Sequence, residues 1–491
     1  MKKKEVAIIG AGIAGIASSI RLRMLGHHVR VFESNKYPGG KLTAFEENGY
    51  RFDMGPSLFT MPHMIEELFE LTKKPIEKYF SYIKKENICS YFFEDGTFFL
   101  APGDKEEFIE KATKTFDVSE NKLRYYLARN KKKYDLTASL FLEKSLHKKE
   151  TYLSSDAIKA LFNFNKLDIQ DSLSSLNEKT FKDQRLVQFY NRFATYNGSS
   201  PYRTPGIMSM IPHLEQHYGT YFPKGGMHQI TLSLFSLAKD IGVEFNFNSP
   251  VNKIETQRGE ITGIRVNKKL IDADIVVSNA DVVSTYRRLL SHYPAPEKVL
   301  SQERSSSALI FYWGIQKEFP KLDLHNIFFS KDYQEEFDYI FNKKMIHEDP
   351  TIYINISSKE EPGDSPEGCE NWFTMINVPN NSGQDWDSMI NKARENILKK
   401  LSRLLHHDIV KLIKYEAILD PRDIESKTQS FQGALYGAAS NNKFSAFLRH
   451  PNFKNSIKNL YFCGGSVHPG GGIPLCLLSG KIVAELIKKN S

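Results

Sequence analysis

Hydrophobic and polar positions near the N-terminus follow a strand–helix–strand pattern. Residues 5–9 form a nearly continuous apolar run, which is typical of a strand buried on both faces. After a glycine-rich stretch, apolar residues return with helical spacing until Gly26, and residues 28–33 predict a second strand. This order of elements predicts a parallel βαβ unit.

The rest of the chain divides into regions of different pattern. We expect helices at 62–71, 104–116, 385–406 and 479–489, and a mostly helical insertion at 117–217. A hairpin is predicted at 91–100, and strands are predicted at 242–254, 261–266 and 273–278. Residues 305–315 and 350–378 indicate a second, mixed sheet.

Three glycines join the first strand to the first helix with the spacing of a dinucleotide-binding turn. Gly10 permits the tight turn, Gly12 lets the backbone approach a pyrophosphate, and Gly15 allows the helix to pack closely on the strand. The helix N-terminus then offers N–H groups and a positive dipole end to the phosphates. Glu33 ends the second strand, where a carboxylate accepts hydrogen bonds from ribose hydroxyls and repels the 2′-phosphate of NADP.

Two further glycine clusters favour FAD over NAD. Gly39-Gly40-Lys41 offers a second close backbone approach and a cation. Near the other end, Gly464 and Gly465 follow an apolar strand, and residues 470–474 precede an apolar helix. Such backbone suits a flat ring system, and a helix N-terminus favours the charge of reduced flavin.

These motifs together resemble the bacterial-type phytoene desaturase family, the FAD-dependent carotenoid desaturases of the flavin amine oxidase-like group. The matching stretches run nearly from end to end: the N-terminal fingerprint, 39–41, 52–57, 221–227, 277–281 and 468–474. The chain departs from the family at Lys41, where an arginine is usual, and at Leu475-Cys476, where Gly-Val is usual.

Two segments are more similar to one branch of that family. Residues 191–201 and 311–314 resemble the desaturases that act on hydroxylated carotenoid ends and introduce a 3,4 double bond beside a 1-hydroxy group. The resemblance therefore implies a hydroxylated, γ-carotene-type substrate, with phytoene- or dehydrosqualene-type desaturation as the alternative.

The resemblance also implies the fold class and the division of the chain. We expect an α/β protein with a Rossmann-type FAD-binding domain, a mixed-sheet substrate domain and a helical insertion. The FAD-binding domain would comprise 1–85, 218–300 and 415–491, the substrate domain 86–116 and 301–414, and a membrane-facing helical region 117–217.

The residues expected to contact FAD come from the shared motifs. They are Gly10, Gly12, Ala14, Gly15, Glu33, Gly39, Gly40, Lys41, Gly55, Pro56, Ser57, Val251, Asn279, Ala280, Gly464, Gly465, Gly472, Ile473 and Pro474.

The family chemistry implies hydride transfer to the flavin and loss of a proton from the neighbouring carbon. A polyene can delocalise the cation, so a strong protein base is not required. Arg192 is the candidate catalytic residue, either positioning the substrate hydroxyl or stabilising reduced flavin; a solvated helix arginine is the alternative. Tyr196 is a second hydroxyl-binding candidate, and His468 is expected to be structural.

Composition adds information about the environment of the protein. The chain has 491 residues, is 41% hydrophobic and 25% charged, and carries a net charge of +8. Four cysteines without CxxC spacing fit a reducing cytoplasm and predict no metal site. No apolar run is long enough to span a bilayer. Because the implied substrate is hydrophobic, we expect lysines in 117–217 to seat the protein on the inner face of the cell membrane, and an ordinary solvated helix face is the alternative.

The sequence leaves open the electron acceptor and several rival functions. Oxygen and quinone are both plausible electron acceptors, and no motif indicates nucleic-acid binding. A flavin-dependent carotenoid isomerase or oxygenase shares the expected fold. A prenyl-carrying binding protein, such as a GDP-dissociation inhibitor, is the non-enzymatic alternative.

Overall fold

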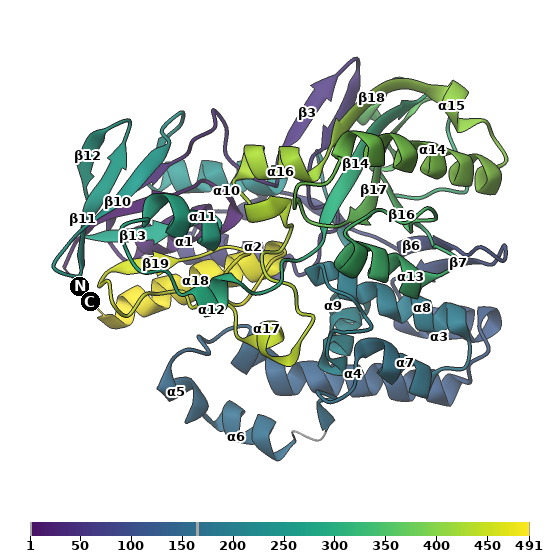
Figure 1. Cartoon of the computed structure of the whole chain (residues 1–491), viewed down its shortest axis with the longest axis horizontal. Helices are drawn as coiled ribbons and strands as arrows, with labels where there is room; N and C mark the ends of the chain where they lie inside the picture. The colour runs from purple at the N-terminus through teal and green to yellow at the C-terminus, as the bar shows by residue number, and fades with distance from the viewer. Residues whose placement is uncertain (1, 164–165, 491) are drawn as a thin grey trace.

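A five-stranded parallel sheet forms one half of the molecule (Figure 1). The structure, a computed structural model, describes residues 2–163 and 166–490. The strand order is β19-β13-β1-β2-β9, with bounds β1 Glu5–Ile9, β2 His28–Phe32, β9 Glu244–Asn246, β13 Ile275–Ser278 and β19 Leu460–Phe462. Helix α1, Ile13–Met24, joins β1 to β2, which confirms the predicted βαβ unit.

The two ends of the chain lie side by side in this half (Figure 1). Strand β19 pairs in parallel with β13, which pairs with β1, and the C-terminal helix α18 (Ile473–Asn490) packs on α1. A Cβ on Gly480 would stand 3.1 Å from the backbone nitrogen of Ser18, so the missing side chain permits this close approach. Helix α18 begins earlier than predicted, because Pro474 is tolerated in a first helical turn.

A seven-stranded mixed sheet forms the other half, as the sequence predicted. Its order is β18-β14-β17-β16-β15-β6-β7, and only β15 and β6 are parallel neighbours. The bounds are β6 Asn87–Phe92, β7 Phe98–Pro102, β14 Ser307–Ile315, β15 His325–Phe328, β16 Ile352–Ile356, β17 Glu370–Val378 and β18 Ile413–Leu419.

Alternate side chains of this sheet serve two different environments, since successive strand residues point to opposite faces. On one face Leu309, Phe311 and Trp313 join a core that helix α14 (Trp386–Leu405) covers. On the other face Ala308 and Ile310 line a cavity.

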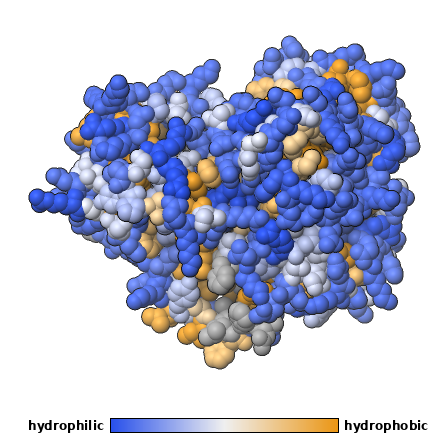
Figure 2. Space-filling view, viewed as in Figure 1, coloured by the Kyte–Doolittle hydropathy of each residue, from blue (hydrophilic) through white to orange (hydrophobic). Residues whose placement is uncertain are grey.

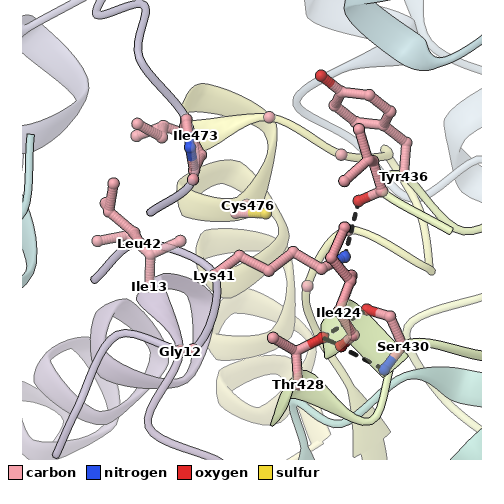
Figure 3. Close-up of a pocket in the computed structure, with 18 of the residues that line it drawn as sticks. Gly12, Ile13, Lys41, Leu42, Ile424, Thr428, Ser430, Tyr436, Ile473 and Cys476 are labelled. Carbon is pink, nitrogen blue, oxygen red and sulfur yellow. Dashed lines mark hydrogen bonds between the residues drawn. The ribbon is translucent and has the colours of Figure 1, made fainter. Parts of the chain in front are cut away.

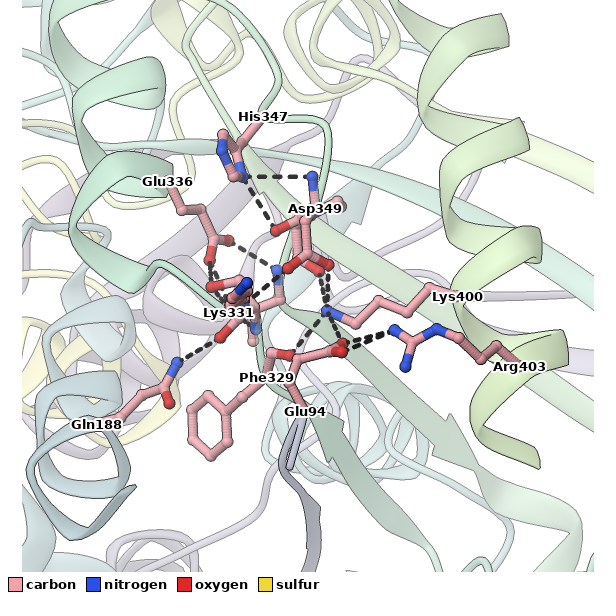
Figure 4. Close-up of polar contacts among 12 residues, drawn as sticks. Glu94, Gln188, Phe329, Lys331, Glu336, His347, Asp349, Lys400 and Arg403 are labelled. Carbon is pink, nitrogen blue, oxygen red and sulfur yellow. Dashed lines mark hydrogen bonds and ion pairs between the residues drawn. The ribbon is translucent and has the colours of Figure 1, made fainter. Parts of the chain in front are cut away.

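A buried lysine fastens α14 to the sheet (Figure 4). Lys400 Nζ donates to the carbonyl oxygen of Phe329 at 2.7 Å and to the carboxylate of Asp349 at 2.7 Å. Glu94 lies 3.4 Å from the same nitrogen and also pairs with Arg403, one turn further along α14. The helix is thereby held in register over the sheet.

The predicted helical insertion at 117–217 is helical. It contains α4 Glu120–Phe141, α5 Lys149–Tyr152, α6 Ser155–Phe162, α7 Leu173–Thr180, α8 Gln184–Asn191, α9 Ile211–Tyr218 and short 3-10 segments at Arg192–Asn197 and Gly206–Met210. One lysine of the basic run at 131–133 does not face solvent: Lys133 is buried and pairs with Asp168 at 2.6 Å. It therefore adds nothing to a lipid-facing surface.

Smaller elements complete the chain. The remaining strands are β3 Ala44–Glu47, β4 Tyr50–Asp53, β5 Tyr82–Lys84, β8 Tyr221–Pro223, β10 Val251–Gln257, β11 Glu260–Val266 and β12 Lys269–Asp272. The remaining helices are α2 His63–Thr72, α3 Lys105–Thr115, α10 Gln229–Asp240, α11 Val282–Ser284, α12 Glu297–Leu300, α13 Tyr333–Asp338, α15 Ile409–Leu412, α16 Pro421–Thr428 and α17 Lys443–Phe447. None of the helices within the described ranges is long and apolar enough to cross a bilayer.

Candidate functional site

One cavity of about 710 Å³ connects the two halves of the molecule. Its first part is built by loops at the carboxyl ends of β1, β2, β13 and β19, which contribute Gly10, Glu33, Asn279 and Gly464. The carboxyl edge of a parallel sheet is where dinucleotides bind in open α/β folds. Its second part is lined by the inner face of the seven-stranded sheet.

The structure brings nearly all predicted site residues to this cavity. Those that line it are Gly10, Gly12, Ala14, Glu33, Gly39, Gly40, Lys41, Gly55, Pro56, Ser57, Arg192, Val251, Asn279, Ala280, Gly464, Gly465, Gly472, Ile473 and Pro474. Gly15 does not line it. A Cβ on Gly15 would stand 2.2 Å from the carbonyl oxygen of Gly10, so this glycine serves the packing of α1 on β1.

The glycines create space that a side chain would fill. A Cβ on Gly12 would lie 2.7 Å from Nδ2 of Asn279, and a Cβ on Gly55 would lie 1.9 Å from the carbonyl oxygen of Lys41. Gly12 also caps the N-terminus of α1, so free N–H groups of the first turn face the cavity. Bare backbone beside a helix N-terminus fits a pyrophosphate-bearing group such as FAD.

Glu33 is buried directly after β2, where its carboxylate accepts hydrogen bonds from two backbone N–H groups and one hydroxyl group. Its Oε2 accepts the N–H of Ala11 at 2.8 Å, and its Oε1 accepts the N–H of Asn35 at 2.9 Å and the hydroxyl of Ser34 at 3.1 Å. A carboxylate has about four acceptor positions, so these bonds leave capacity for a ribose hydroxyl.

Lys41 projects into the same part of the cavity, between α18 and the segment that precedes Tyr436 (Figure 3). Its ammonium donates to the carbonyl oxygens of Leu435 at 2.8 Å and Ala434 at 3.2 Å. Burial lowers its pKa, and the nearby carboxylate of Asp281 opposes that effect. The third ammonium proton has no bond among the described residues and is available to an anion.

The second part of the cavity is mainly apolar. The seven-stranded sheet contributes Ala308, Ile310, Ile327, Phe373, Met375 and Leu419 to its wall. An apolar wall of this kind suits a hydrocarbon.

Arg192 lies at the edge of this part, where α8 passes into a 3-10 turn. It is 5% exposed, so the alternative of a solvated helix arginine is wrong. Its Nη1 donates to the hydroxyl of Tyr196 at 2.9 Å, and its Nη2 donates to Glu215 at 3.0 Å and to Tyr91. Burial opposes the charge, yet Tyr196, Tyr91 and Glu215 together raise the pKa of Arg192 above its usual value.

Sequence reasoning named Tyr196 but missed the other two partners of Arg192. Glu215 is a single carboxylate on α9, a helix whose sequence gives no sign that this position is buried. Tyr91, on β6, meets Arg192 only through the packing of α8 on the sheet. His468 is buried outside the cavity lining and bonds the carbonyl oxygen of Lys144 at 2.8 Å, in keeping with the structural role expected for it.

Comparison with known proteins gives the family. Residues 13–488 match the model of a protein family described as "Flavin containing amine oxidoreductase". A 1-hydroxycarotenoid 3,4-desaturase from Flavobacterium sp. (strain P99-3) is 58% identical over 99% of both chains, and a 4,4'-diapolycopene oxygenase from Methylomonas sp is 33% identical over 99% of this chain and 98% of that protein.

A solved structure supports the fold assignment. Cyclohexylamine oxidase from Brevibacterium oxydans superposes with a TM-score of 0.63 at 15% identity, covering 100% of this chain and 99% of that one. The family match makes the chain an oxidoreductase rather than a prenyl-carrying binding protein. The chain belongs to the flavin-containing amine oxidoreductase family, has FAD as its cofactor, and is carotenoid desaturase-like within that family.

Proposed function

We propose that this protein introduces a C=C bond beside the hydroxylated end of a γ-carotene-type carotenoid. The observation that carries the proposal is one continuous cavity, whose glycine-lined part suits FAD and whose apolar part suits a polyene. The 58% identity to a 1-hydroxycarotenoid 3,4-desaturase supports the choice of substrate and bond.

The reaction removes a hydride and a proton from adjacent carbons of the substrate. Bound FAD supplies the hydride acceptor, and oxygen or a quinone is the proposed final electron acceptor. The protein orients the polyene through the apolar wall formed by residues such as Ile310, Phe373 and Met375, which also excludes water. The proton leaves a carbon made acidic by the delocalised charge, so the proposal assigns no protein base.

Arg192 is proposed as a positioning residue. The guanidinium forms an ion pair with Glu215 and hydrogen bonds with the hydroxyl groups of Tyr91 and Tyr196. Arg192 is therefore a neutralised polar group held in a fixed orientation beside the cavity, not a free cation. Such an edge suits the orientation of the hydroxylated substrate end.

We also propose that the parts of the chain divide the work as the sequence suggested. FAD would be held by 1–85, 218–300 and 415–491, and substrate by 86–116 and 301–414. Strand β18, Ile413–Leu419, spans the boundary at 414/415 and pairs with β14 of the substrate sheet, so the two parts share a strand there.

Region 117–217 is proposed to seat the protein peripherally on the cytoplasmic face of the cell membrane. Around α5 and α6 it exposes Tyr152, Leu153, Ile158 and Phe162, of which Leu153 and Phe162 are 81% and 84% exposed. Figure 2 has hydrophobic side chains gathered at the lower edge of the molecule, where Figure 1 places α5 and α6. The exposed lysines Lys149 and Lys159 complement anionic lipid.

The test is turnover of a carotenoid panel by FAD-loaded protein in liposomes. The proposal predicts a product two mass units lighter than a 1-hydroxycarotenoid, with red-shifted absorbance. A product heavier by one oxygen would favour an oxygenase, for which the 33% identical 4,4'-diapolycopene oxygenase is the precedent. Conversion of phytoene alone would favour the phytoene-type alternative, and an unchanged mass would favour an isomerase.

A further inference from the structure

A histidine of the substrate sheet lies on the wall of the cavity. His325 begins β15, is 3% exposed, and lines the cavity together with Tyr353 of the neighbouring strand β16. In the antiparallel register His325 stands opposite Asn355, so these side chains share the inner face of the sheet.

The hydrogen bonds around His325 identify which ring nitrogen carries its proton. Asn355 Nδ2 donates to the carbonyl oxygen of Leu324 at 3.0 Å, which fixes this atom as the amide nitrogen. The same nitrogen lies 3.3 Å from Nδ1 of His325, so Nδ1 is an acceptor. In the neutral ring the proton is therefore on Nε2.

A directed chain of hydroxyl groups follows from this tautomer. Tyr353 donates its hydroxyl proton to Nδ1 of His325 at 2.8 Å, and its oxygen accepts from Oγ of Ser57, also at 2.8 Å. Ser57 belongs to the segment assigned to FAD, so only two hydrogen bonds separate His325 from that segment.

Nε2 of His325 is buried and has no hydrogen-bond partner among the residues that the structure describes. Burial lowers the pKa of His325 to about 3, so the ring stays neutral near neutral pH and Nε2–H is a donor without charge. A buried donor without an acceptor is unfavourable, and a ligand oxygen in the cavity would relieve it. Nε of Arg192, another cavity-lining residue, is also buried without a partner.

We propose that Nε2–H of His325 donates a hydrogen bond to the hydroxyl oxygen at the end of the substrate, which makes His325 a specificity-determining residue. This inference rests on the proposed function. In a 1-hydroxycarotenoid the oxygen is three bonds from C3, so an anchored hydroxyl also places the C3–C4 bond. A hydrocarbon end would leave the donor unpaired and be disfavoured.

Two substitutions separate the donor from the structural role of the ring. In His325→Asn the side-chain amide can still accept from Tyr353 at the position of Nδ1, but it is too short to reach the position of Nε2. In His325→Gln the amide nitrogen reaches the position of Nε2 and keeps a donor there. Flavin content should match wild type in both variants. The thermal unfolding midpoint should match wild type in His325→Asn, whereas His325→Gln should lower it because the Tyr353 hydroxyl loses its acceptor at Nδ1.

The experiment measures Kd by quenching of tryptophan fluorescence, and kcat/KM, for a 1-hydroxycarotenoid and for the same polyene without the hydroxyl. His325→Asn should reduce the preference for the hydroxylated ligand about tenfold in both quantities, and His325→Gln should restore most of it. A His325→Asn variant that keeps the wild-type preference would overturn the inference, as would a wild type that binds both ligands equally.

The binding measurement keeps the inference distinct from the proposed function. If wild type binds with the expected preference and His325→Asn loses it, yet neither ligand is desaturated, the assignment of His325 stands and the proposed reaction fails. If desaturation occurs but the preference does not depend on His325, the reaction stands and the inference fails.

Discussion

The Arg192 guanidinium and the Glu215 carboxylate form a buried ion pair, 3.0 Å apart, at the edge of the cavity. The hydroxyl group of Tyr91 bonds to Arg192, and that of Tyr196 bonds to both members of the pair, so four side chains from β6, the 3-10 turn after α8, and α9 make one network. Removing one of these side chains leaves its partners as buried and unsatisfied polar groups, which is unfavourable.

Replacing Arg192 by alanine should therefore destabilise the protein by about 3–5 kcal/mol, because Glu215 stays buried without its partner. Turnover should fall more than flavin content, since the network borders the apolar part of the cavity, where we propose that the substrate binds. Thermal unfolding, flavin absorbance and kcat measure the three effects. Arg203→Ala is the control: its pair with Glu303 is partly exposed, and its loss should cost about 0–1 kcal/mol. Normal stability and activity in Arg192→Ala would contradict the prediction.

Glu33→Ala should weaken FAD binding about tenfold or more, because the acceptor for ribose is lost and the N–H groups of Ala11 and Asn35 lose their partner. Titration of the apoprotein with FAD measures the effect. Glu244→Ala, on β9 of the same sheet but exposed and outside the cavity lining, should keep wild-type affinity. If Glu33→Ala and Glu244→Ala bound FAD with equal affinity, Glu33 would have no role in binding the cofactor.

Gly12→Val should abolish flavin loading. A Cβ alone at this position would stand 2.7 Å from Asn279 Nδ2, and the two valine methyl groups would extend further into the cavity. Gly363→Val is the matched control, because a Cβ at Gly363 meets no atom within 4 Å. Flavin absorbance of the purified variants gives the result. A yellow Gly12→Val protein would contradict the proposal that FAD binds against the backbone at Gly12.

The double variant Leu153→Asp/Phe162→Asp should bind anionic vesicles at least about tenfold more weakly, since two exposed apolar side chains can no longer enter the lipid interface. Flotation with vesicles of mixed anionic and neutral lipid measures binding. Val410→Asp/Ile418→Asp alters exposed apolar residues on α15 and β18 and should bind as wild type does. Equal losses in both variants would show that the α5–α6 surface has no special role.

The contribution of His28 to stability should depend on pH. Hydrogen bonds from the ring to Glu5 at 2.6 Å and to Glu244 at 2.9 Å raise the pKa of His28 above 6.5. Because the pKa is raised in the folded state, the protonated ring stabilises the fold. This stabilisation is fully present below pH 6.5 and is lost as the pH rises through the pKa of the folded state. The difference in thermal stability between wild type and His28→Gln should thus be larger at about pH 5.5 than at about pH 8.5. A difference independent of pH would count against the ion pairs.

The sequence predicted the residues that line the glycine-rich part of the cavity because its signals are local. Gly10, Gly12 and Glu33 act through backbone shape and one strand end, and these features depend on neighbours within one βαβ unit. The C-terminal glycines could be recognised in the sequence for the same reason, because they lie between a strand and a helix.

The lining of the apolar part of the cavity could largely not be predicted from the sequence. His325, Tyr353 and Glu215 come from different strands and from a helix, and only the non-sequential order of the seven-stranded sheet and the packing of α9 bring them to one wall. Lys133 illustrates the same limit. Its position in a run of lysines suggested a solvent-exposed side chain, but Lys133 is buried and forms an ion pair with Asp168. Long-range pairing of this kind leaves no periodic pattern along the chain.

The parallel pairing of β19 with β13 has a consequence for biosynthesis. The wall of the cavity includes several residues between Gly464 and Cys476, so a nascent chain made only as far as β19 lacks part of that wall. We therefore expect complete FAD binding only after this segment has been synthesised and β19 has paired with β13; until then apolar strand faces stay exposed, a state that favours aggregation.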